Sequence, residues 1–170
     1  MPCRSITLRG TVTHHQIAPI RNCTLILGYL RIINARFIDF ISKNSTNTTI
    51  EPLFPNITEI SDYFLVFQAH HITNLAQITP RLSVIHGTRL FRSSFALVLF
   101  LSPSLTHVNL GRLVSIRQGT VLLSRLYHVC YVSTVDWSAL LNATDLKRQQ
   151  FNPLGELKSS RDHDNDPASI

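Results

Sequence analysis

The chain has 170 residues, of which 44% are hydrophobic and 15% are charged. This length suits one domain with its own core, and the composition is that of a globular protein rather than a disordered one. The formal net charge is +6, but the Lys and Arg residues are scattered singly, so we expect no nucleic-acid partner. The longest purely apolar run, Phe95–Leu101, is far shorter than the roughly 20 residues of a spanning helix, so no direct membrane contact is expected.

The first 22 residues are mixed and polar, and we interpret them as an N-terminal cap segment. Cys3 and Cys23 lie at its two ends, either joined in a disulfide that would stabilise the fold by roughly 3 kcal/mol or left as two free thiols. Three cysteines leave at least one unpaired within the chain. Residues 1–38 contain no Asp or Glu, as in a mitochondrial transit peptide, and Met1–Gly10 is not followed by the apolar stretch of a signal peptide.

A rhythm of apolar residues recurs four times between residues 23 and 124. In each unit, two apolar residues spaced three apart lead through a turn residue to a strand-like run: 29–33, 63–67, 89–91 and 120–124. The turn residues are Gly28, Asp62, Gly87 and Gly119. Such a period is typical of solenoids, in which each unit buries its apolar face by stacking on the next. We therefore expect the short strands to lie side by side in a parallel sheet. The side chains that should line one shared buried column are Ile26, Ile60, Ile85 and Ile116.

Other segments fit between or after these units. Ile72–Ile78 and Leu105–Leu113 have the spacing of leucine-rich repeats, and the run 96–101 indicates an extra strand or a buried edge. Asp136 is a good N-cap for a short terminal helix over Trp137–Leu141. The chain becomes polar after about residue 142, so 143–170 is predicted to be a disordered tail.

No pattern in the sequence indicates catalysis. The pairs His14-His15 and His70-His71 cannot chelate one ion from a regular strand, because successive side chains point to opposite faces. Zinc, phosphate-binding and serine-hydrolase motifs are absent from the sequence, and its carboxylates show no spacing for acid–base work. We therefore expect that this chain is not an enzyme and that it binds no metal and no cofactor.

Five N-x-S/T sequons stand out. Chance would supply one or two in a chain of this composition, so five favour an exported glycoprotein. Because export needs a signal peptide, we expect the amino terminus to be incomplete. The glycosylation sites predicted in this way are Asn22, Asn44, Asn47, Asn56 and Asn142.

Six stretches between Asn22 and Leu141 carry a more specific signal: NCTLILGYLRI, FPNITEISDYFLVF, LSVIHGTRLF, FALVLF, SIRQGTVLL and VCYVSTVDW. In this order they resemble the first L domain of the insulin receptor and insulin-like growth factor receptor family. The resemblance implies a mainly β fold, a right-handed parallel β-helix of leucine-rich-repeat-like coils with short capping helices, over residues 23–142. It also implies a Cys3–Cys23 disulfide and a partner for Cys130 some thirty residues further on, where this sequence has no cysteine. That departure suggests a fragment or a truncated product.

In that family, hormone docks on the outward face of the parallel strands. Strand alternation places one set of side chains inside: Leu30, Ile32, Phe64, Val66, Leu90, Val121 and Leu123. The apolar members of the outward set are expected to form an exposed stripe, a feature that marks binding surfaces. The ligand-binding residues predicted on this basis are Arg31, Ile33, Leu65, Phe67, Arg89, Phe91, Phe95, Leu122 and Ser124.

The resemblance thus implies a ligand-binding module of a receptor tyrosine kinase ectodomain, on the extracellular side of the plasma membrane, with no kinase activity in this chain. Its expected partners are an insulin-like peptide and other ectodomain domains or a second receptor chain. The alternative is a secreted L-domain protein that sequesters ligand or pairs with a receptor. An imported mitochondrial protein is a third interpretation, which the five sequons disfavour.

Overall fold

The computed structural model describes residues 1–44, 47–130, 135–141 and 150–152, and this part of the chain is mainly β. The helical segments are short: α1 (His14–Ile17), η1 (Ala18–Ile20), η2 (Ile38–Phe40), η3 (Leu75–Gln77) and α2 (Trp137–Leu140). The strands are β1 (Pro2–Thr11), β2 (Leu25–Arg36), β3 (Ile41–Asn44), β4 (Asn47–Ile50), β5 (Glu59–Ile60), β6 (Phe64–Phe67), β7 (Val84–Ile85), β8 (Phe95–Phe100), β9 (Ser115–Ile116), β10 (Thr120–Ser124) and β11 (Gln150–Asn152).

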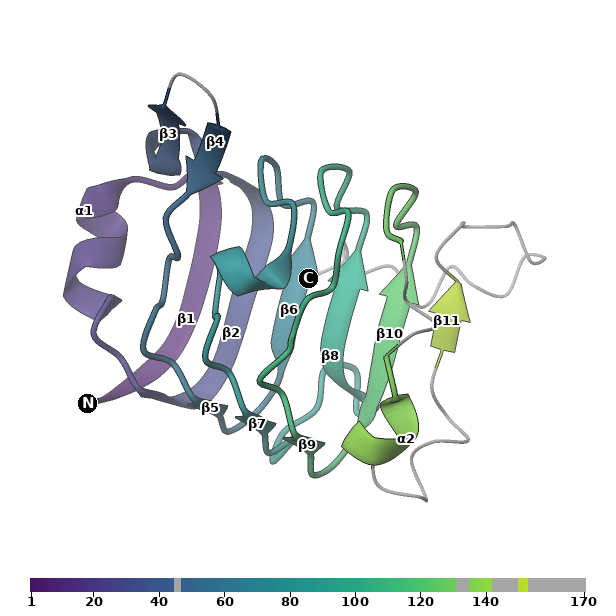
Figure 1. The fold of residues 1–170 in the computed structure, drawn as a ribbon. Helices are drawn as coiled ribbons and strands as arrows, with labels where there is room; N and C mark the ends of the chain where they lie inside the picture. The colour runs from purple at the N-terminus through teal and green to yellow at the C-terminus, as the bar shows by residue number, and fades with distance from the viewer. Residues whose placement is uncertain (45–46, 131–134, 142–149, 153–170) are drawn as a thin grey trace.

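Nine of these strands form one parallel sheet, in the order β11-β10-β8-β6-β2-β5-β7-β9, with β1 also paired to β2. Strand β2 is long enough to take part in two ladders. Its residues 25–26 pair with β5, and its residues 30–33 pair with β6. Figure 1 shows the result: β1, β2, β6, β8 and β10 lie side by side on one side of the molecule, and β5, β7 and β9 step along another. Strands β3 and β4 form a separate antiparallel hairpin.

The predicted isoleucine column is confirmed. Ile26 pairs with Ile60, Ile60 with Ile85, and Ile85 with Ile116, all in parallel register. All four side chains are at most 1% exposed and belong to one buried cluster. The repeat therefore places equivalent residues directly beside one another in successive turns of the chain, as stacking of apolar units requires.

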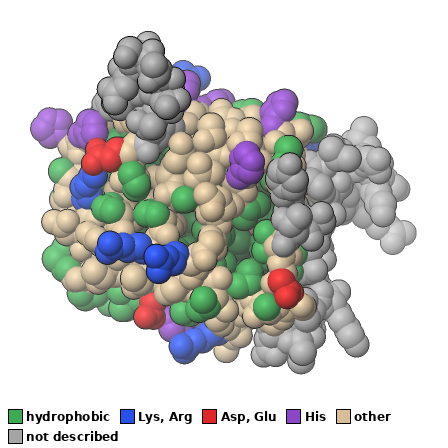
Figure 2. Space-filling model, viewed as in Figure 1, with side chains coloured by type: hydrophobic (Ala, Val, Ile, Leu, Met, Phe, Trp, Pro, Cys, Tyr) green, Lys and Arg blue, Asp and Glu red, His purple; other side chains and the backbone are tan. Residues whose placement is uncertain are grey.

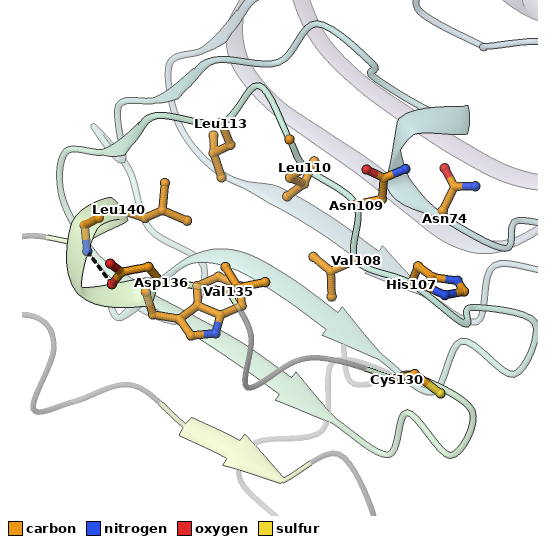
Figure 3. Close-up of a pocket in the computed structure, with 13 residues that line it drawn as sticks. Asn74, His107, Val108, Asn109, Leu110, Leu113, Cys130, Val135, Asp136 and Leu140 are labelled. Carbon is orange, nitrogen blue, oxygen red and sulfur yellow. Dashed lines mark hydrogen bonds between the residues drawn. The ribbon is translucent and has the colours of Figure 1, made fainter.

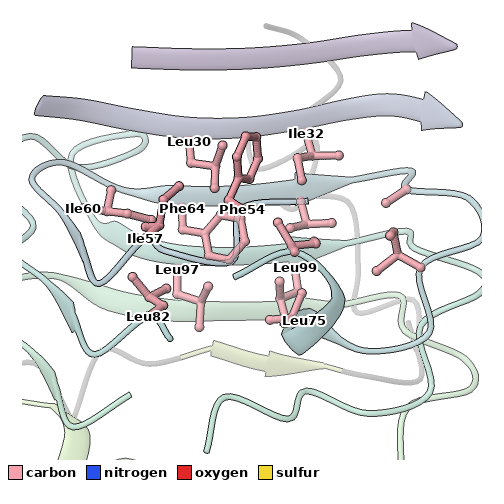
Figure 4. Packing of buried hydrophobic residues seen from close by; sticks show 14 of the residues in the cluster. Leu30, Ile32, Phe54, Ile57, Ile60, Phe64, Leu75, Leu82, Leu97 and Leu99 are labelled. Atoms are coloured by element: carbon pink, nitrogen blue, oxygen red, sulfur yellow. The ribbon is translucent and has the colours of Figure 1, made fainter. Parts of the chain in front are cut away.

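The column is part of an inner core between the two ladders (Figure 4). Leu30 and Ile32 of β2, and Phe64 of β6, point into it from the long strands. The inward set predicted from alternation is confirmed, with Leu90 only partly buried at its margin. Ile72, Leu75 and Ile78 of the first leucine-rich-repeat-like segment close the core from the other side.

The strand predicted over 89–91 is wrong, and the strand of this unit is β8, predicted only as an extra strand or an edge. In the second unit Phe64 follows Ile60 by four residues, whereas Phe95 follows Ile85 by ten. The additional residues form a protruding turn in which Arg92 and Ser93 have positive φ and Phe91 bridges Phe95 in antiparallel fashion. β8 then pairs with both β6 and β10, which fits its six buried apolar residues.

The same kind of corner follows the outward-facing residues of β2, β6, β8 and β10. The residue after the last outward-facing position adopts a left-handed backbone conformation, with φ between 48° and 51°. Left-handed residues other than glycine are uncommon, so the repetition indicates that the stacked geometry imposes this conformation on each turn. These corner residues are Asn34, Gln68, Leu101 and Arg125.

The two ends of the stack are built differently. At the N-terminal end, the predicted cap segment contributes β1 to the sheet before α1 and η1 cover the core, and Cys3 is joined to Cys23 with a Cα–Cα distance of 5.8 Å. At the C-terminal end, α2 confirms the predicted helix, because the Asp136 carboxylate accepts a hydrogen bond from the Ala139 amide at 3.1 Å. Within the predicted tail, residues 150–152 form β11 beside β10; its remaining residues lie outside the described ranges.

Candidate functional site

A second apolar cluster covers the opposite face of the long strands, and we call it the outer layer. Its buried members are Ile33, Tyr63, Leu65, Phe67, Phe91, Phe95, Val98, Phe100 and Leu122. Parallel register places six of them, Ile33, Leu65, Phe67, Val98, Phe100 and Leu122, in two rows across the sheet that continue into polar residues at their ends. One row runs Thr7, Arg31, Leu65, Val98, Leu122, and the other runs Arg9, Ile33, Phe67, Phe100, Ser124.

The prediction of an exposed apolar stripe is wrong in one respect. The apolar residues expected to bind ligand do share the outward face, but their exposed fractions are between 0% and 9%. The physical reason visible in the structure is lateral packing of large side chains on neighbouring strands. Phe67 and Phe100 have ring centroids 5.7 Å apart, as do Tyr63 and Phe91. The outer layer is therefore a packed sheet of side chains rather than a row of isolated ones.

The polar members of the predicted set lie around the outer layer. Arg31 is half-buried beside it, Ser124 is half-buried at the end of one row, and Arg89 is exposed. The Arg89 guanidinium donates to the buried Asp62 carboxylate at 3.0 Å from its Nε, so it supports the turn between β5 and β6. Arg89 is consequently the member of the set with a clear structural role.

Arg31 is held in an aromatic clamp. Its guanidinium carbon lies 4.1 Å from the Tyr29 ring centroid and 5.3 Å from that of Tyr63, and the two rings are stacked 5.3 Å apart. Arg31 Nε also donates to the Tyr63 hydroxyl at 2.5 Å. Burial raises the pKa of the Tyr63 phenol above its ordinary value, although the neighbouring Arg31 opposes the shift. The clamp fixes a cation at the border of the outer layer.

Sequence reasoning missed five residues of this face. Val98 and Phe100 were missed because β8 was not recognised as the strand of the third unit. Arg9 was missed because β1 was not expected in the sheet. Tyr29 and Tyr63 were quoted only as strand starts, yet aromatic residues at matching positions of two successive repeats were a usable signal.

A pocket of about 730 Å³ lies at the C-terminal end of the stack. Figure 3 shows Leu110, Leu113 and Leu140 near α2, and His107 and Cys130 at the other end of the pocket. Trp137 contributes to the lining from α2. Figure 2, which views the molecule from this side, shows charged side chains of both signs scattered around a hollow lined with hydrophobic groups. None of the predicted ligand-binding residues lines this pocket, and Cys130 is a free, exposed thiol.

The predicted glycosylation sites lie away from the outer layer wherever the structure describes them. Asn22 is exposed just before β2, and Asn56 is half-buried just before β5. Asn44 and Asn47 pair with each other in the β3–β4 hairpin, which projects from the stack in Figure 1. Asn142 lies outside the described residues. Within those residues, no group of three or more His, Cys, Asp or Glu side chains could hold a metal ion.

A mainly β chain built on one parallel sheet, with few and short helices, is consistent with the fold of a receptor L domain. Residues 22–141 match the family model described as "Receptor L domain", and the chain belongs to this family. No helix in the part of the chain that the structure describes is long and apolar enough to cross a membrane.

Curated relatives are insulin receptor-like proteins. The chain is 37% identical over 136 residues to the insulin-like peptide receptor of Branchiostoma lanceolatum, covering 80% of this chain and 9% of that protein. It is 34% identical over 160 residues to the insulin receptor of Xenopus laevis, covering 91% and 11%. It is 32% identical over 160 residues to the insulin-like receptor of Drosophila melanogaster, covering 94% and 7%. The chain thus spans about a tenth of the length of these relatives.

Proposed function

We propose that this chain is a ligand-binding L domain of an insulin receptor-like ectodomain and that it binds an insulin-like peptide on the outer layer. The observation that carries the proposal is the outer layer itself. A sheet that only closed its own core would need one apolar face, and this sheet has two. Aromatic and aliphatic side chains gathered on one outward face are typical of the centre of a protein interface.

The positions of the sequons support the same face. The sequons in the described ranges lie in the turns before β2 and β5 or on the β3–β4 hairpin. Glycans attached there would leave the outer layer open to a partner. We propose that these asparagines are glycosylated and that the chain works outside the cell. Other ectodomain domains or a second receptor chain would be further partners, and any kinase activity would belong to other parts of a full-length receptor.

The finer fold assignment belongs to this proposal as well. We infer that the successive units form a right-handed parallel β-helix with short capping helices, as the family resemblance implies. The isolated parallel bridges Arg36–His70 and Asn74–His107, together with the parallel pairing of the main strands, support a chain that turns in the same direction in every unit.

The test is isothermal titration of the 170-residue chain with a panel of insulin-like peptides. Phe67 is the residue to remove, because it lies in the middle of one row and contacts Phe100. Phe67→Ala should weaken binding of any responsive peptide by about tenfold or more, whereas Phe67→Leu, which keeps an apolar side chain, should weaken it less. Val114→Ala is the matched control, since Val114 is 66% exposed and precedes β9 on the other ladder. No heat from any peptide, or equal heat from wild type and Phe67→Ala, would contradict the proposal.

A further inference from the structure

Arg9 and Arg31 lie on the outward face of β1 and β2, and Arg36 is exposed just beyond the corner at Asn34. Thr7 of β1 pairs with Arg31, Arg9 pairs with Ile33, and Thr11 pairs with Arg36. Arg9 therefore lies one strand across from β2, between the levels of Arg31 and Arg36. Arg9 and Arg31 are therefore diagonal neighbours on one face, whereas Arg36 is three residues further along β2 than Ile33, past the left-handed residue Asn34. We call Arg9, Arg31 and Arg36 the arginine strip.

No carboxylate within the described ranges neutralises the arginine strip. The ion pairs found there are Arg21–Glu51, His86–Glu59 and Arg89–Asp62, and none uses a member of the strip. Residues 1–38 contain five Arg and no Asp or Glu, so any carboxylate partner must come from later in the chain, as Glu51 does for Arg21. Arg9 and Arg36 are exposed, and Arg31 is half-buried in its clamp.

The arginine strip borders the outer layer directly. Arg31 is in the same row as Leu65, and Arg9 is in the same row as Ile33 and Phe67. Two further cations lie over rings of the outer layer, with the guanidinium carbons of Arg92 and Arg125 5.9 Å and 5.4 Å from the ring centroids of Phe91 and Phe100. An apolar centre bordered by arginines is complementary to a partner that carries carboxylates beside apolar side chains.

We propose that the peptide recognised by this face is acidic, with carboxylates on the arginine strip and apolar side chains on the outer layer. This inference rests on the proposed function and adds the chemical class of the ligand. The clamped Arg31 would contribute most to orientation, because its guanidinium is already held by Tyr29 and Tyr63 and loses little freedom on binding. Arg9 and Arg36 would chiefly accelerate association.

The experiment uses two synthetic amphipathic helical peptides with the same Phe and Leu face, one bordered by Glu and the other by Gln. Fluorescence anisotropy should show that the Glu peptide binds about tenfold more tightly at low salt, and that added NaCl removes the difference. The Arg9→Gln/Arg31→Gln/Arg36→Gln variant should lose this preference. The matched control, Arg81→Gln/Arg112→Gln/Arg117→Gln, removes the same charge from exposed positions beside β7 and β9 and should keep it.

The outcomes separate this inference from the proposed function. If insulin-like peptides bind and are weakened by Phe67→Ala, but bind the arginine-strip variant equally well, the acidic class is wrong and the binding face stands. Equal affinity for the Glu and Gln peptides, or no binding of either, overturns the inference. Tighter binding of a heparin oligosaccharide than of the Glu peptide, through the same three arginines, also overturns the inference. The arginine strip would then be a binding site for a sulfated polysaccharide.

Discussion

Phe64 and Phe67 lie on the same four-residue strand, three positions apart, and point to opposite faces of the sheet. Phe64 packs into a core whose members extend from Ile6 in β1 to Leu141 near the C-terminal end of the stack. Phe67 packs into the outer layer, whose buried members come from β2, β6, β8 and β10 and from Tyr63 and Phe91 beside them. Both phenylalanines are less than 5% exposed, so burial alone does not distinguish them.

The comparison teaches that connectivity separates the two apolar faces. The inner core is enclosed by the chain itself, because every repeat passes around it and contributes side chains to it. The fold therefore cannot form without packing this core. The outer layer is assembled laterally from side chains of adjacent strands. A change in the inner core should therefore act mainly on stability, and a change in the outer layer mainly on binding.

The largest expected effect is the loss of stability when a phenylalanine of the inner core is removed, and it tests the difference between the two faces. Phe64→Ala should lower the free energy of unfolding by about 3–5 kcal/mol, because it leaves a cavity in a closed core. Phe67→Ala should cost clearly less, since its neighbours can relax towards the solvent side. Chemical denaturation with urea measures both, and equal losses would remove the distinction between the faces.

The disulfide ties β1, which contributes Ile6 and Leu8 to the inner core, to the segment just before β2. Replacing Cys3 and Cys23 by Ser should lower the free energy of unfolding by about 3 kcal/mol on the chain-entropy model. Thermal unfolding measures this loss, with Cys130→Ser as the control because Cys130 is a free thiol. A double variant as stable as the control would show that β1 needs no covalent attachment.

The turn between the two ladders gives a smaller and more local test. A Cβ at Gly87 would lie 2.1 Å from the Gln118 carbonyl oxygen of the next unit, whereas a Cβ at Gly10 would meet nothing within 4 Å. Both residues have φ near +70°, at 70° and 65°. Gly10→Ala should therefore cost about 1 kcal/mol for its backbone alone, and Gly87→Ala should cost more because the units must also separate. Equal melting temperatures for the two variants would contradict the observed stacking.

The smallest expected effect is a shift in the ionisation of Tyr63, which tests whether water is excluded from the outer layer. Burial raises the pKa of Tyr63, so the folded chain favours the neutral phenol. This contribution to stability is present below pH about 10, the ordinary phenol pKa, and is lost as the pH rises through the higher folded-state value. An ultraviolet titration of wild type minus Tyr63→Phe should show a tyrosine that ionises later than an exposed one. A difference curve centred on the ordinary phenol pKa would contradict the burial of Tyr63 and indicate that water reaches the outer layer.

The sequence allowed the stack to be predicted because its period marks the column directly: Ile26, Ile60, Ile85 and Ile116 pair as the spacing indicated. It also separated the two faces, since alternation along a strand is set by backbone geometry. The insertion after Gly87 could not be placed, because a turn and a strand of three residues look alike in sequence. The exposure of the outer layer could not be predicted either, because lateral packing depends on neighbours that come from distant repeats.

The most direct test of the binding face is methyl nuclear magnetic resonance of the 170-residue chain, with Ile, Leu and Val methyl groups labelled, during titration with an insulin-like peptide that binds in calorimetry. The outer layer and the inner core each contain such methyl groups, so one spectrum observes both. The proposal predicts the largest shifts at Ile33, Leu65, Val98 and Leu122. Shifts confined instead to Val108, Leu110, Leu113 and Leu140 would place the ligand in the C-terminal pocket and contradict it.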